Sequence, residues 1–240
     1  MKLKKLFRRK QKDPHCSVVV VAAGSSERMG GDKMLMTLGA KPVIIRTLMA
    51  FQKSPMVDDI VVVTKREKIT AIADMIKLYD ITKVTQVISG GATRVESSLA
   101  GVSAVRRGAK LIAIHDGARP LVSQELIERV VKEANEHISA VPVLPSTDTL
   151  KQVDSRGVIV EGVDRASVFR VQTPQVFDAD IIKGALTKAV EKRLPITDDC
   201  SAVDMMGFST YTVEGDAGNI KLTLPEDMVL AEAILKSRGE

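Results

Sequence analysis

Short runs of apolar residues alternate along this chain with longer segments in which apolar residues recur every three or four positions. Continuous apolar runs are typical of strands buried on both faces of a sheet, and the longer spacing is typical of amphipathic helices. Residues 18–21 show the first pattern and residues 67–78 the second. We therefore predict strands at residues 18–21, 59–64, 84–88, 111–114, 139–143 and 208–213, and helices at residues 42–51, 67–78, 93–106, 124–135, 179–191, 199–205 and 225–236.

This alternation predicts an α/β fold, Rossmann-like, with a mostly parallel sheet and helices on both faces. One segment breaks the rhythm. Residues 148–154 and 158–163 are strand-like and flank a Ser-Arg-Gly turn, which predicts a β-hairpin. Because the hairpin interrupts the order of strands and helices, we expect an arm of about residues 146–166 that projects from the body. A projecting ribbon needs a partner to cover it, so the arm is a predicted dimerisation element.

Length and charge divide the chain into two unequal parts. The 240 residues suit one large domain, which we expect to span residues 16–240. Residues 1–13 carry seven Lys/Arg against one Asp, so they hold more than the whole net charge of +5. We expect residues 1–15 to be a disordered, solvated basic tail, with binding to an anionic membrane or nucleic acid as the alternative.

Composition excludes several classes of protein. Trp is absent and aromatic residues make up 3% of the chain, which argues against recognition of nucleic acid by base stacking. The tail lacks the apolar stretch of a secretory signal, and no apolar run is long enough to span a membrane. The two cysteines, Cys16 and Cys200, are far apart and form no metal-binding motif. We expect a cytoplasmic protein without membrane insertion.

The end of the first predicted strand carries candidate chemistry. The strand runs into Ala22, Ala23 and Gly24, and two cations follow, Arg28 and Lys33. Small residues let backbone N–H groups approach a polyphosphate, and the cations neutralise its oxygens. The spacing fits neither a Walker loop nor the dinucleotide fingerprint. We predict a nucleoside triphosphate site, with an ordinary strand-to-helix turn and solvated cations as the alternative.

Two further strands end in polar residues, and the carboxyl ends of parallel strands meet at one edge of a sheet. Gly90 and Gly91 follow the third strand, with Ser97 one helical turn later, and suit main-chain contacts to a ribose or base. Asp116 follows the fourth strand and suits Mg²⁺, which prefers hard oxygen ligands. Arg119, three residues on, suits a substrate phosphate. The alternatives are a plain turn at the glycines and an Asp116–Arg119 ion pair that closes a turn.

The order of several short motifs resembles one family of enzymes. Residues 22–33 resemble the phosphate loop of nucleotidyltransferases that activate sugars and polyols. The chain from residue 17 onward is similar to the 2-C-methyl-D-erythritol 4-phosphate cytidylyltransferase family. The motifs that carry this resemblance are Gly90-Gly91-Ala92-Thr93-Arg94, His115-Asp116-Gly117-Ala118-Arg119-Pro120, Val163-Asp164-Arg165, Gln172-Thr173-Pro174-Gln175, Ile196-Thr197-Asp198-Asp199 and Asn219-Ile220-Lys221-Leu222-Thr223.

Three positions depart from the family pattern. Ser26 stands where the family usually has glycine, Asp32 where it usually has proline, and Ala92 where it often has aspartate near the base.

The resemblance implies a reaction in which CTP and methylerythritol phosphate give a CDP-alcohol and pyrophosphate, in a homodimer whose arm embraces the second subunit. Asp116 is expected to hold Mg²⁺. Each residue role is expected as follows: catalysis by Arg28, Lys33, Arg165 and Lys221; nucleotide binding by Ala22, Ala23, Gly24, Lys33, Gly90, Gly91, Ser97 and Asp116; acceptor binding by Asp116, Arg119, Thr149, Arg165, Thr197 and Lys221.

Alternatives remain at this point for both the residues and the reaction. Surface hydrogen bonding explains Thr149, helix capping explains Thr197, and simple exposure explains Lys221. The rival functions are a cytidylyltransferase for another polyol phosphate such as ribitol 5-phosphate, a guanylyl- or uridylyltransferase, and a non-catalytic nucleotide-binding protein.

Overall fold

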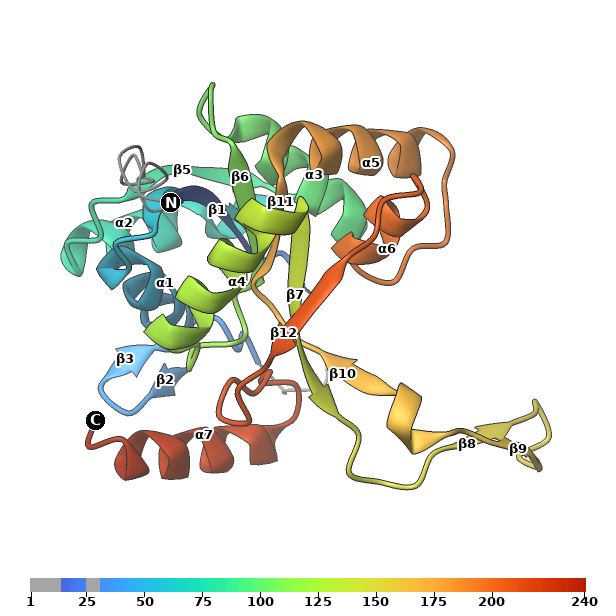
Figure 1. Ribbon diagram of the computed structural model, residues 1–240. Helices are drawn as coiled ribbons and strands as arrows, with labels where there is room; N and C mark the ends of the chain where they lie inside the picture. The colour runs from blue at the N-terminus through green and yellow to red at the C-terminus, as the bar shows by residue number, and fades with distance from the viewer. Residues whose placement is uncertain (1–13, 25–30) are drawn as a thin grey trace, which may run out of the picture.

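The computed structural model describes residues 14–24 and 31–240 and shows an α/β fold built on one large sheet (Figure 1). Within the described residues this sheet has eight strands, in the order β10-β7-β11-β6-β1-β4-β5, with β12 paired to β7. The predicted strands are present, with ends shifted by a few residues. The strands of the sheet are β1 (Cys16–Val21), β4 (Val57–Thr64), β5 (Val84–Ser89), β6 (Leu111–Asp116), β7 (Ser139–Pro145), β10 (Phe169–Val171), β11 (Gln175–Asp178) and β12 (Tyr211–Glu214).

Helices cover both faces of the sheet, as the sequence predicts. The strand β1 shows why: Val18 and Val20 belong to the apolar cluster on one face, and Val19 belongs to the cluster on the other. A strand buried on both faces has no polar side, which explains its continuous valine run. The first face is covered by α1 (Val43–Lys53), α2 (Ile69–Leu78) and α4 (Gln124–His137), and the second by α3 (Arg94–Ala104), α5 (Ala179–Glu191) and α6 (Asp199–Asp204).

A smaller apolar cluster holds the C-terminal helix. The helix α7 (Pro225–Ser237) packs beside the ribbon of β2 (Thr37–Leu38) and β3 (Lys41–Pro42), with Ala231 and Leu235 buried. This packing brings the segment just before α7 alongside the loop that follows β6, since the Leu222 N–H donates to the Ala118 carbonyl at 2.9 Å.

Strand direction divides the sheet. The strands β6, β1, β4 and β5 are mutually parallel, so their carboxyl ends lie on one edge. The strand β11 runs antiparallel between β6 and β7, and β10 runs antiparallel beside β7. The strands β10 and β11 were not predicted from the sequence, because each has only three or four residues, too few to show a period.

The predicted hairpin is present and stands apart from the main sheet. Its strands, β8 (Lys151–Val153) and β9 (Ile159–Gly162), pair antiparallel in a two-stranded sheet of their own. Figure 1 shows this ribbon extending away from the body. Its apolar side chains are open, with Ile159 62% exposed and Val160 60% exposed. Within the described chain nothing covers these side chains.

The structure tests some, but not all, of the predictions about the tail, membrane insertion and the cysteines. Residues 1–13 lie outside the described residues, so the predicted tail stays a prediction. Among the helices that the structure describes, none has the length and apolar character needed to cross a membrane. Cys16 and Cys200 are buried free thiols, as expected from their spacing. Burial, together with Asp58 and Asp59, raises the pKa of the Cys16 thiol to about 12, so this thiol is not reactive near neutral pH.

Two helical glycines give a matched test of the packing between α3 and the sheet. A Cβ at Gly101 would overlap Val19 Cγ1 and lie 2.8 Å from Val63 Cγ2, whereas a Cβ at Gly184 in α5 meets nothing within 4 Å. Alanine gains about 1 kcal/mol of helix propensity over glycine, and overpacking costs about 1–3 kcal/mol. We expect Gly101→Ala to destabilise the fold by up to about 2 kcal/mol and Gly184→Ala to stabilise it by up to about 1 kcal/mol in urea unfolding. Equal stabilisation by both variants would contradict the close packing.

Candidate active site

The carboxyl ends of β1, β5 and β6 surround a cavity of about 560 Å³. Parallel pairing brings these ends to the same edge of the sheet, where open α/β folds bind ligands. The loop after β6 and the segment before α7 complete the wall. The residues that line the cavity are Val21, Ala22, Ala23, Gly24, Lys33, Met34, Thr64, Lys65, Arg66, Glu67, Ser89, Gly90, Gly91, Ala92, Thr93, Arg94, Ser97, Asp116, Ala118 and Lys221.

Most of the residues predicted from the sequence meet in this cavity. They come from four separate segments, which supports the expectation that the polar strand ends converge. Arg28, by contrast, lies outside the described residues. The predicted residues that line the cavity are Ala22, Ala23, Gly24, Lys33, Gly90, Gly91, Ser97, Asp116 and Lys221.

The glycine pair after β5 is shaped by close approach. A Cβ at Gly90 would lie 2.6 Å from Ser97 Oγ and 2.9 Å from Ala23 Cβ, so the loops after β5 and β1 meet only because residue 90 has no side chain. The Ser97 hydroxyl accepts from the Gly91 N–H at 3.2 Å and donates to the Thr93 carbonyl at 2.9 Å. Ser97 therefore fixes the turn that forms this wall of the cavity.

Asp116 lies at the centre of the charges. Its carboxylate is 2.9 Å from Lys221 Nζ, 3.4 Å from an Arg94 nitrogen and 3.6 Å from Arg119 Nε. Burial acts to raise the pKa of Asp116, but Lys221 and Arg94 outweigh it and hold the pKa well below the usual range. The carboxylate therefore remains ionised across the physiological pH range.

Arg94 is a site residue that the sequence analysis missed. Its guanidinium bridges Asp116 and Asp199, with 2.7 Å between Arg94 and the fully buried Asp199 carboxylate. The helix α3 begins with a capping box, in which the Thr93 side chain accepts from the Glu96 N–H. Arg94 is the first residue of this helix, where a cation opposes the helix dipole. That unfavourable placement was a signal that Arg94 serves another purpose.

Two of the three lysines that line the cavity, Lys33 and Lys221, are tied to the same wall. Lys33 Nζ donates to the Leu222 carbonyl at 3.1 Å, and Lys221 is the neighbouring residue. Because Leu222 is itself held by the loop after β6, both ammonium groups lie at the edge where Asp116 ends its strand. The cavity therefore brings Lys33, Arg94 and Lys221, from three separate segments, into the same wall as Asp116.

Arg119 and Thr197 lie outside the cavity lining. Arg119 is 9% exposed, and its guanidinium donates to the Asn219 carbonyl at 2.7 Å. It also faces Asp116, as expected for the alternative of an Asp116–Arg119 ion pair. Thr197 Oγ1 lies 3.2 Å from Ser201 Oγ. The cap of α6 is Asp198, whose side chain accepts from the Ser201 N–H, so the capping explanation for Thr197 is wrong.

The predicted arm residues are also separate from the cavity within one chain. Thr149 precedes β8, and Arg165 begins the short 3-10 helix η3 (Arg165–Ser167). Arg165 donates to the Thr147 carbonyl at 3.3 Å and lines a different, shallow hollow on the arm. The protomer therefore does not bring Thr149 and Arg165 to Lys33 and Asp116.

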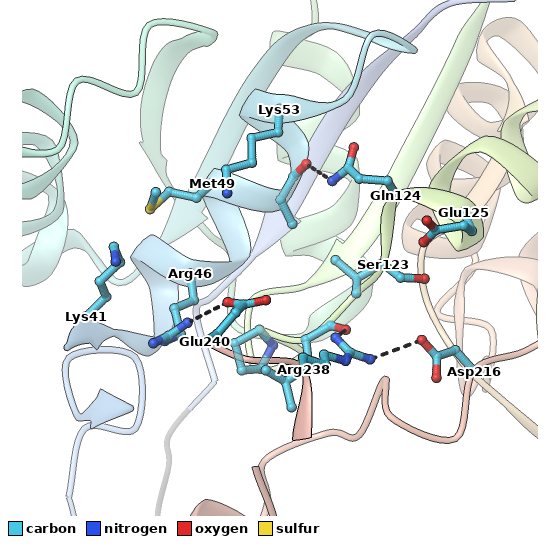
Figure 2. A pocket seen from close by; sticks show the side chains of 14 residues that line it. Lys41, Arg46, Met49, Lys53, Ser123, Gln124, Glu125, Asp216, Arg238 and Glu240 are labelled. Carbon is cyan, nitrogen blue, oxygen red and sulfur yellow. Dashed lines mark hydrogen bonds and ion pairs between the residues drawn. The ribbon is translucent and has the colours of Figure 1, made fainter. Parts of the chain in front are cut away.

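A second cavity, of about 520 Å³, lies between α1, the start of α4 and the C-terminal end of α7 (Figure 2). Its walls are charged, but the arginines are neutralised: Arg46 pairs with Glu240 and Arg238 with Asp216, each at 3.3 Å. None of the residues predicted from the sequence lines it. This cavity lies away from the convergent strand ends.

A small-residue loop at the end of β1 and a carboxylate ringed by cations, on a Rossmann-like sheet, define a nucleotidyltransferase site. The comparison with known families agrees and narrows the class. Residues 16–237 match the family of 2-C-methyl-D-erythritol 4-phosphate cytidylyltransferase, and the chain belongs to that family.

Individual relatives agree over nearly the whole chain. The chain is 38% identical to 2-C-methyl-D-erythritol 4-phosphate cytidylyltransferase of Halalkalibacterium halodurans, over 92% of this chain and 97% of that protein. The crystal structure of the enzyme of that name from Thermus thermophilus is 32% identical, with a TM-score of 0.77 over 92% of this chain and 99% of that one. The 4-diphosphocytidyl-2C-methyl-D-erythritol synthase of Anaerococcus prevotii is 27% identical, with a TM-score of 0.82 over 93% and 99% of the two chains.

The pairing of Arg94 with Asp199 can be tested by stability. Replacing Arg94 with Met leaves the Asp199 carboxylate buried without its cation, and breaking one side of such a pair costs about 3 kcal/mol or more. We expect Arg94→Met to lower the free energy of unfolding in urea by about that amount. Adding Asp199→Asn removes the stranded charge and should recover much of the loss. No recovery in the double variant would show that Asp199 does not depend on Arg94.

Proposed function

We propose that this protein transfers a cytidylyl group from CTP to 2-C-methyl-D-erythritol 4-phosphate in non-mevalonate isoprenoid synthesis. A phosphate oxygen of the acceptor attacks the α-phosphorus of CTP, a new P–O bond forms, and the bond to the β-phosphate oxygen breaks to release pyrophosphate. The single observation that carries the proposal is the cavity at the strand ends, which Lys33 lines and in which Lys221 and Arg94 pair with Asp116.

The chemistry needs charge neutralisation more than proton transfer. The attacking phosphate is already anionic near neutral pH, so no general base is required. Two polyanions must come together, and charge grows on the α-phosphate oxygens and on the leaving pyrophosphate. In the proposed mechanism Lys33, with Arg28 from the same loop, stabilises that charge, while Lys221 orients the acceptor phosphate.

The donor set fits a bound Mg²⁺. Among the described residues there is no group of three or more His, Cys, Asp and Glu side chains that could hold a metal. Mg²⁺ does not need one, because it retains waters and takes one or two carboxylates together with substrate phosphates. Asp116 supplies an ionised oxygen in the cavity. We propose that Asp116 holds Mg²⁺ with the triphosphate, where the ion adds positive charge at the phosphates.

We also propose a cytoplasmic homodimer in which the arm of one chain completes the site of the other. Two observations support this proposal. The exposed apolar side chains of β8 and β9 need cover, and Thr149 and Arg165 lie away from the cavity of their own chain. Arg165 and Thr149 of one chain would then bind the acceptor phosphate at the other chain's cavity. Nucleic acid has no part in this assembly.

A pyrophosphate-release assay tests the reaction and its rivals together. CTP with methylerythritol phosphate should give turnover, whereas ribitol 5-phosphate, or GTP or UTP in place of CTP, should give little. Lys33→Ala should lower kcat by about two orders of magnitude, the usual loss for a charge contact made in the transition state. Lys53→Ala, on α1 at the second cavity, is the matched control and should leave kcat unchanged. Turnover of Lys33→Ala near the wild-type rate would remove Lys33 from its role.

A mixed-dimer experiment tests the crossing of the arm. Arg165→Ala and Lys33→Ala should each be nearly inactive alone. If the arm crosses, a mixed dimer contains one site with both residues intact, so co-expression of the two variants should restore about a quarter of the wild-type activity. Each variant expressed alone with two different tags is the control. An inactive mixture, with mixed dimers isolated by both tags, would contradict an active site shared between chains.

A further inference from the structure

Directly behind the cavity, four residues form a closed ring of hydrogen bonds. The His115 Nε2 lies 3.1 Å from the Arg119 carbonyl, and the Arg119 guanidinium donates to the Asn219 carbonyl at 2.7 Å. The Asn219 amide donates to the Thr173 carbonyl at 2.8 Å, and the Thr173 hydroxyl lies 3.1 Å from His115 Nδ1. All four residues are at most 9% exposed. The ring therefore joins three separate segments: the end of β6, the loop before β11 and the stretch before α7.

The direction of each hydrogen bond follows from its partners. A carbonyl oxygen only accepts, so His115 Nε2 must carry a proton toward Arg119. The Asp116 N–H donates to the Thr173 hydroxyl at 3.0 Å. His115 is fully buried, and its two ring nitrogens contact two uncharged oxygens, the Arg119 carbonyl and the Thr173 hydroxyl, so the imidazole is neutral and its Nδ1 carries no proton. The Thr173 hydroxyl then donates its own proton to Nδ1. Each hydrogen bond of the ring therefore has a defined donor and acceptor.

The ring holds both members of the ion pair in the cavity. Thr173 accepts from the backbone of Asp116, and Asn219 lies two residues before Lys221. Asp116 and Lys221 themselves meet at 2.9 Å. The phenyl group of Phe51 packs edge-on against the His115 imidazole, with 4.8 Å between their centroids, and it shields the hydrogen bonds from water. A shift of any segment would therefore change the distance between the Lys221 ammonium and the Asp116 carboxylate.

We propose that His115, in its neutral Nε2–H tautomer, together with Thr173 and Asn219, acts as a set of positioning residues that fixes Lys221 against Asp116 for nucleotidyl transfer. None of the three touches the reacting atoms. Their effect on the reaction rests on the proposed function, because Lys221 and Asp116 act on phosphates only if that function holds. The hydrogen-bond ring itself does not depend on it.

Nitrogen NMR of the intact, ¹⁵N-labelled protein tests the ring without any activity. The chain has three histidines, and the spectrum of His115→Gln identifies the signals of His115 by their loss. We expect the Nδ1 signal at the position of a bare imidazole nitrogen and the Nε2 signal at the position of a protonated one. The opposite tautomer, or an average of both, would overturn the proposal, since the Arg119 carbonyl and the Thr173 hydroxyl would then lack the stated partners.

Kinetics test the positioning role with a matched pair of substitutions. Thr173→Val removes the hydroxyl at nearly constant volume, and Thr173→Ser keeps it. We expect Thr173→Val to lower kcat by about 10- to 100-fold, in line with the loss of partners that orient reacting groups, and Thr173→Ser to stay within a few-fold of the wild type. Thr187→Val, on α5, is the control for the change itself, because its hydroxyl donates only within its own helix, to the Lys183 carbonyl. That control should leave kcat unchanged.

A double-variant cycle separates positioning from general loss of structure. If Thr173 acts by placing Lys221, Thr173→Val should cost less than about twofold in kcat once Lys221 has been replaced by Ala. Equal losses in both backgrounds, with folding of all variants checked by thermal unfolding, would overturn the proposal. Wild-type protein that lacks transferase activity but shows the stated tautomer would instead contradict the proposed function and leave the ring intact.

Discussion

The site depends on one buried carboxylate that is kept charged. Asp116 is 8% exposed, and its ionised form exists there only because three cations, from α3, from the loop after β6 and from the segment before α7, surround it. Burying a charge costs free energy unless the charge is paired. The fold must therefore hold all three segments together for the carboxylate and its cations to be stable. The same arrangement gives a strongly polar pocket at the mouth of an otherwise apolar sheet. The Asp116 carboxylate therefore serves both the stability of the fold and the proposed chemistry of phosphates.

The parallel part of the sheet makes this arrangement possible. Because β1, β4, β5 and β6 are parallel, their carboxyl ends present four loops on one edge, and helices on both faces keep the strands rigid. Rigid elements hold charged groups more accurately than loops alone do, which matters where positioning supplies most of the catalysis. The two antiparallel strands lie on the other side of β6 and carry the segment with Thr173, which supports the pocket from behind.

The sequence was informative where local pattern and topology agree. The valine run of β1, the small residues after it and the polar ends of β5 and β6 predicted the sheet edge and nine of the twenty residues that line the cavity. Arg94 was missed because Thr93 and Glu96 form a capping box, a local pattern that accounts for the start of the helix without Arg94. The pairing of Arg94 with Asp199 joins residues more than a hundred positions apart, and no local pattern encodes such a contact. Likewise β11 is too short to show a period and forms because β6 and β7 offer it unpaired backbone on both sides.

The arm cannot be explained within one chain, because its exposed apolar side chains are not covered by the described part of the protomer. The residues expected to bind the acceptor are divided between the cavity wall, with Lys221, and the exposed arm, with Arg165. The described residues proposed to bind the nucleotide line one cavity of the protomer together with Asp116, whereas the ribbon of β8 and β9 is exposed there. On the proposed function, this division would give the two substrates different structural requirements: the nucleotide pocket would follow from the fold of one chain, and acceptor binding from association of two chains. On the proposed dimer, activity would depend on protein concentration even where folding does not, since a folded monomer would keep its charged pocket, Lys221 included, but lose the partner's Arg165 and Thr149.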